Sequence, residues 1–107
     1  MTYFSVTQGD DRTLTITASS SLEDMDLTWT ARHRRYSEDV VIEKTTGSGI
    51  TTGSAPFRTA VIALDAADTR DLDPDVLYWD LQIVDGQAKT TTVASGRLAV
   101  EGDVTRP

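Results

Sequence analysis

The fold is decided by residues 76–84, which read Val-Leu-Tyr-Trp-Asp-Leu-Gln-Ile-Val. Within this stretch every second residue is large and apolar, and polar residues stand between them. A period of two places successive side chains on opposite faces of a β-strand. Asp85-Gly86 follows directly, and both residues tolerate the positive φ of a tight hairpin turn. The residues predicted to face the core are Leu77, Trp79, Leu81 and Ile83.

Six further segments show the same alternation or are rich in β-branched residues. Threonine alone contributes 17 of the 107 residues, and its branched Cβ suits the half-exposed surface of a sheet. Gly96 lies inside the last segment and predicts a bulge or a bend there. The six segments are residues 3–7, 12–18, 26–34, 40–44, 57–64 and 88–100. Their residues predicted to face inward are Leu14, Ile16, Ala18, Leu27, Trp29, Ala31, Ala60, Ile62 and Leu64.

One short segment, residues 65–72, has the pattern of a helix. Asp65 suits the N-cap position, and Asp68 three residues later completes the pattern of a capping box. Pro74 prevents the helix from continuing. Residues 45–56 hold three of the seven glycines, and we expect them to form a flexible connection.

Seven short strands with turn signals between them, and no helix long enough to cover a sheet, predict an all-β fold. We expect an immunoglobulin-like β-sandwich of about seven strands, with Trp29 and Trp79 packed centrally between its sheets. A small closed barrel is the alternative. The chain has no cysteine, so the sandwich has no disulfide. The length suits a single domain, residues 1–107, with extended N- and C-terminal segments.

The charge balance argues against several classes of partner. Ten Lys and Arg against 17 Asp and Glu give a net charge of −7 and an isoelectric point near 4.4. Nucleic acid and anionic membrane surfaces repel such a chain, so we expect neither as a partner. The N-terminus lacks the cationic and apolar segments of a signal peptide, and no apolar run is long enough for a membrane helix. We therefore expect the chain to be made and to fold in a cytoplasm.

The sequence carries no motif of a catalytic site. His33 is the one histidine. A Gly-x-Ser-x-Gly stretch is lacking, and so is a glycine-rich phosphate loop with its lysine. We expect no enzymatic activity and no cofactor.

Asp71, Asp73 and Asp75 begin like a calcium-binding loop, in which alternating carboxylates supply oxygen ligands. The motif requires Gly at the next position and Glu at the twelfth. This chain has Val76 and Gln82 there. We expect a solvated turn, and a calcium ion between loops is the alternative.

Residues 32–36, Arg-His-Arg-Arg-Tyr, form the one basic cluster of the sequence. On a strand Arg32 and Arg34 share one face, and His33 and Arg35 share the other. The cluster suits an acidic surface on a partner, for example on another copy of this acidic chain. The alternative is an ordinary strand end whose arginine stems cover apolar surface.

As a whole, the order of segments resembles a group of small bacteriophage proteins and the N-terminal domains of phage upper baseplate proteins. The resemblance lies in a Gly-Asp turn before an alternating strand, a short strand with a Gly-Ser-Gly loop, an Ala-Asp-Thr turn and a Thr-rich last strand. Asp75 stands where these proteins usually have a glycine after the proline, and the aromatic run of the sixth strand is Leu77-Tyr78-Trp79. The matching segments are residues 8–17, 26–32, 41–50, 64–69, 74–83 and 85–98.

The resemblance implies a non-enzymatic structural component of a virion, either a tail or baseplate protein or a capsid decoration protein. Such a protein is located in the virion, contacts other phage structural proteins, and is present as a homo-oligomer or in many copies of a symmetric particle. We expect residues 2–6 and 101–107 to contact partners. The alternative is a carbohydrate- or host-surface-binding module that uses Tyr36 and residues 47–56. The candidate partner-binding residues are Tyr3, Phe4, Arg32, Arg34, Arg35, Tyr36, Val104 and Arg106.

Overall fold

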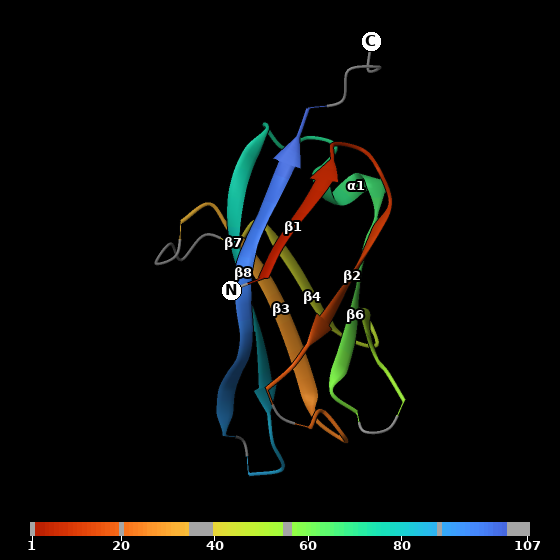
Figure 1. The fold of residues 1–107 in the computed structure, drawn as a ribbon, viewed down its shortest axis with the longest axis vertical. Helices are drawn as coiled ribbons and strands as arrows, with labels where there is room; N and C mark the ends of the chain where they lie inside the picture. Colours follow the sequence, from red (N-terminus) through yellow and green to blue (C-terminus); the bar gives the residue numbers. More distant parts are fainter. Residues whose placement is uncertain (1, 20, 35–39, 55–56, 88, 103–107) are drawn as a thin grey trace.

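A computed structural model describes residues 2–19, 21–34, 40–54, 57–87 and 89–102. These residues form eight strands and one short helix (Figure 1). The all-β prediction is therefore confirmed. The strands are β1 (Thr2–Thr7), β2 (Arg12–Thr17), β3 (Asp26–Arg32), β4 (Ile42–Thr46), β5 (Gly49–Thr52), β6 (Thr59–Leu64), β7 (Asp75–Val84) and β8 (Thr90–Glu101), and the helix is α1 (Ala66–Thr69).

The strands hydrogen-bond in the order β1-β8-β7-β3-β4-β5-β6-β2. The link between β4 and β5 is short, since only Thr45–Gly49 and Thr46–Ile50 are paired. The sheet turns over there and forms two layers, β1-β8-β7-β3-β4 and β5-β6-β2, which face each other as a sandwich (Figure 1). The N–H of Ser19, just after β2, donates to the carbonyl of Val93 in β8 at 3.3 Å. This bond partly closes the sandwich toward a barrel.

The core lies between the two layers. All the residues predicted to face inward are buried, because the alternation of each strand is maintained in the sheet. Trp29 and Trp79 belong to neighbouring strands of one layer, and their rings lie 6.2 Å apart between centroids. Phe4 of β1 packs on Trp79 with a centroid distance of 5.8 Å. The central packing predicted for the two tryptophans is confirmed, although they lie side by side in one layer.

Asp65 is the N-cap of the helix, as predicted. The backbone N–H of Asp65 donates to the carboxylate of Asp68 at 2.7 Å, and this bond is one half of a capping box. The turn between β1 and β2 is attached to this segment. Gly9 N–H donates to the Oγ1 of Thr69 at 3.0 Å, and the side-chain amide of Gln8 donates to the Leu72 carbonyl. The β1–β2 turn, which links the two end strands of the sheet, is therefore attached to the β6–β7 connection at Thr69 and Leu72.

Residues 45–56 were expected to be flexible, but β5 lies within them. Gly47 and Gly49 have φ of 79° and 103°, which only glycine adopts at little cost. These angles reverse the chain tightly enough for a fifth short strand, and Ile50 anchors it in the core. The strand β5 has only four residues, which is too short for an alternation of apolar and polar residues to be recognised in the sequence.

The β7–β8 hairpin differs from the expectation in two details. The register shift lies opposite Leu81 and Gln82, at Val93 rather than at Gly96. Gly96 is paired with Trp79 in the regular part of the ladder, and opposed residues share a face. The connection is stabilised by the Asp85 carboxylate, which accepts the backbone N–H groups of residues 87 and 89 at 2.9 and 3.0 Å. Asp85 and Gly86 do not adopt positive φ.

The N-terminal segment contains the strand that was predicted at residues 3–7. Thr2–Thr7 forms β1, which pairs in parallel with β8 from Gly96 to Glu101. Val6 is buried in the core. The segment is therefore an integral strand of the domain, because its alternating apolar residues bury against β8 and its neighbours. Of the C-terminal segment, Glu101 ends β8, and residues 103–107 lie outside the described residues.

Candidate interaction surface

The outer face of the β1-β8-β7-β3-β4 layer carries a row of aromatic and cationic side chains. Tyr3 of β1 is paired with Arg97 of β8, Arg97 with Tyr78 of β7, and Tyr78 with Arg32 of β3. Directly opposed residues of neighbouring strands lie on the same face. The four residues therefore alternate Tyr, Arg, Tyr, Arg across four strands. We call them the Tyr–Arg row.

The sequence of each strand explains why this row faces outward. Every member is next to a residue that faces the core: Phe4, Ala31, Trp79 and Leu98. Because side chains alternate, the members themselves point away from the core. Tyr3 is 61% exposed, the largest exposure among the large apolar side chains that the structure describes. The Arg97 guanidinium carbon lies 5.4 Å from the centroid of the Tyr78 ring, a cation–π contact that orients both groups.

Next to the Tyr–Arg row, toward the end of β7 and the start of β3, the same face forms a polar concavity. The concavity has a volume of about 630 Å³. Asp80 is opposite Thr30, and the Thr30 hydroxyl donates to the Asp80 carboxylate at 3.1 Å. Glu43 of β4 is opposite Thr30 on its other side. The concavity is lined by Thr28, Thr30, Arg32, Glu43, Tyr78, Trp79, Asp80, Gln82, Thr92, Ser95 and Gly96.

The face thus places two guanidinium groups beside two carboxylates. Arg32 and Arg97 belong to the Tyr–Arg row, while Asp80 and Glu43 lie one row away. Side chains of these types offer oriented hydrogen bonds and aromatic contacts rather than an apolar patch. A membrane-crossing helix is not found among the described residues.

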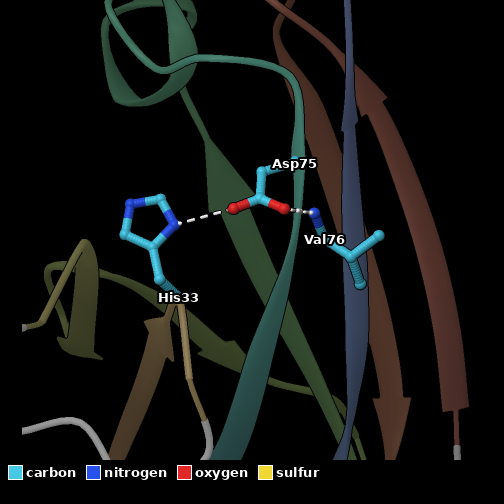
Figure 2. A network of polar contacts seen from close by, with 3 residues as sticks. All are labelled: His33, Asp75 and Val76. Carbon is cyan, nitrogen blue, oxygen red and sulfur yellow. Dashed lines mark hydrogen bonds and ion pairs between the residues drawn. The ribbon is translucent and has the colours of Figure 1, made fainter.

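His33 and Asp75 form a polar contact at the end of this layer (Figure 2). His33 Nδ1 lies 3.2 Å from one carboxylate oxygen of Asp75, and the other oxygen accepts the N–H of Val76 at 2.7 Å. Both side chains are about half exposed. The contact connects the chain just after β3 with the start of β7. Within the part of the chain that the structure describes, no three His, Asp or Glu side chains gather as a metal site would require.

The structure places two of the sequence-predicted site residues in one row. Tyr3 and Arg32 are the two ends of the Tyr–Arg row. Arg34 is exposed beyond the end of β3, and Phe4 is partly buried and packs against the core. The other predicted residues lie outside the described residues. They are Arg35, Tyr36, Val104 and Arg106.

Arg97 was missed by the sequence reasoning. It stands alone in a Thr-rich strand, with no second basic residue beside it. Its importance comes from the pairing of β8 with both β1 and β7. Its outward position between Gly96 and Leu98 was the available signal.

Comparison with protein-family models matches no family, and comparison with curated proteins finds no similar sequence. The resemblance to bacteriophage proteins therefore depends on the order of the segments in the sequence.

Proposed function

We propose that this chain is a non-enzymatic structural component of a bacteriophage virion, a tail, baseplate or capsid decoration protein. It docks on a larger symmetric assembly through the outer face of its five-stranded layer. The single observation that supports docking is the Tyr–Arg row. Tyrosine and arginine are the residue types enriched at protein interfaces and at their energetic centres.

The chemistry of the row favours a protein partner with an acidic surface. Tyr3 is a large ring that is mostly exposed to water, and its burial on a partner would be favourable at little entropic cost. Arg97 is oriented by its contact with Tyr78, so less conformational freedom is lost on binding. In a chain with a net charge of −7, two arginines in one row attract carboxylates locally.

Quantitative mass spectrometry of purified particles tests the proposal. A ratio near one copy per capsid subunit assigns the protein to head decoration, and a handful of copies per particle assigns it to the tail or baseplate. Arg97→Ala is expected to reduce incorporation by about tenfold, the effect of losing about 1.4 kcal/mol at an interface. Thr91→Ala on the same strand serves as the matched control and should incorporate normally. Absence of the wild-type protein from particles would refute the virion role.

A carbohydrate-binding role is the second candidate, and the polar concavity favours it. Tyr78 offers part of a ring for stacking on a sugar, and Asp80 and Gln82 offer hydrogen-bond partners for hydroxyl groups. A glycan array checks this role. Strong binding that is lost in Asp80→Ala but kept in Thr91→Ala would favour it over docking on a protein.

A further inference from the structure

The strand β2 ends the β5-β6-β2 layer, and among the described residues no strand pairs with its outer edge. Ala18 N–H donates to the Arg58 carbonyl at 2.7 Å, so the even-numbered residues of β2 form the hydrogen-bonded pairs with β6. The odd-numbered residues therefore direct their N–H and C=O groups toward the free edge. Ser19, the next odd-numbered residue, confirms this, since its N–H donates away from β6 to Val93. The residues with outward backbone groups are Thr13, Thr15 and Thr17.

This edge lacks the devices that normally protect an exposed strand. Natural edge strands carry charges, prolines or bulges that prevent pairing with another chain. After Arg12, the sequence has no charged residue and no proline until after Leu22. The register of β2 with β6 is unbroken. The outer face beside the edge is uncharged as well, since the exposed threonines of β2 lie opposite Ala63, Val61 and Thr59.

We propose that β2 pairs antiparallel with β2 of a second copy of this chain, about a two-fold axis at Thr15. In that register Thr13 lies opposite Thr17 of the copy, and Thr15 lies opposite Thr15. The residues that meet are those whose backbone groups already point outward. A two-fold contact must be self-complementary in this way. The pairing extends a three-stranded layer into a six-stranded one.

The charge distribution favours a second copy at this edge. Two chains of net charge −7 repel each other over most of their surfaces. In the proposed register the paired residues 13–17 are uncharged, and Arg12 would lie opposite Ala18, so no like charges are paired directly across the axis. The end strand of the other layer, β1, is also uncharged from Thr2 to Thr7.

Sedimentation velocity over about a hundredfold range of concentration tests the inference. The wild-type chain is expected to form a dimer of twice 11.7 kDa. Thr15→Lys and Thr15→Glu should each weaken the dimer about fivefold to tenfold, because equal charges then face each other across the axis. An equimolar mixture of the two variants should restore the dimer. Thr91→Lys, on an exposed threonine of β8, is the matched control and should leave the dimer unchanged.

Restoration by the mixture shows that each variant still folds and that residue 15 faces its own copy. A wild-type chain that stays monomeric at every concentration would overturn the inference. So would a dimer that Thr15→Lys and Thr15→Glu do not weaken, or one that mixing does not restore. The inference is independent of the virion role. A monomer that still enters particles would refute only the dimer, and a dimer absent from particles would refute only the virion role.

Discussion

Replacing Asp68 and Lys44, singly and together, should reveal a coupling of about 1 kcal/mol between helix α1 and strand β4. The Nζ atom of Lys44 lies 2.8 Å from Oδ2 of Asp68. The same oxygen accepts the backbone N–H of Asp65 at 2.7 Å. The Asp68 carboxylate therefore caps the start of α1 and also forms an ion pair with Lys44 of β4. The side chains of Lys44 and Asp68 are only 13% and 21% exposed.

The partial burial of Lys44 and Asp68 determines how large a coupling energy we expect. Exposed ion pairs contribute about 0.2 to 1 kcal/mol, and hydrogen bonds to charged groups contribute about 1.5 to 3 kcal/mol. A largely buried pair at the surface of the core should lie between these ranges. Asp68→Asn removes the charge and keeps an oxygen for Asp65. Lys44→Met removes the ammonium group and keeps most of the apolar stem, which lies close to Gly49.

Urea unfolding monitored by tryptophan fluorescence provides the assay, because Trp29 and Trp79 are both buried and become exposed together. Each single variant should lose about 1 kcal/mol of unfolding free energy, or about 4 to 8 °C in Tm. The double variant should lose clearly less than the sum of the two. A coupling energy below about 0.3 kcal/mol would refute the reasoning, because that is the additivity expected of independent sites.

Two further substitutions test the backbone arguments, both by urea unfolding. Gly49→Ala should destabilise the fold by about 1 to 3 kcal/mol, since its Cβ would lie 2.5 Å from Cδ of Lys44 and φ is 103°. Gly86→Ala is the control and should change stability by less than about 0.5 kcal/mol, since no atom lies within 4 Å of its Cβ; equal losses in the two variants would contradict this. Thr69→Val should cost about 1 to 2 kcal/mol, because Gly9 N–H loses its acceptor at a fully buried position; an unchanged urea midpoint would show that the bond contributes nothing.

The strands and their inward faces could be predicted from the sequence alone. Leu14, Ile16, Leu77 and Trp79 were assigned to the core because a period of two separates apolar from polar residues within a few positions. The start of α1 was predictable for the same reason. Its cap depends on residues three positions apart, so no distant part of the chain is needed to recognise it.

Features that depend on pairing between distant segments were not predictable. Val93 forms the bulge of the β7–β8 hairpin, although the glycine three residues later carries the usual sequence signal. The strand β5 (Gly49–Thr52) pairs with Val61 and its neighbours in β6, a contact that a four-residue pattern does not reveal. Loop closure and register determine such contacts, and both depend on the whole chain.

The candidate surface shows the same division. The sequence by itself determined that Arg32 and Tyr78 point outward, since each stands next to a predicted core residue, Ala31 or Trp79, in an alternating strand. Only the tertiary structure decided that they belong to one row, because the four residues of the Tyr–Arg row come from four strands, β1, β3, β7 and β8, which meet through three separate registers. A slip of one residue in any register would turn the partner to the opposite face. The chemistry of each side chain is local, whereas the surface that the side chains make together depends on how the strands are paired.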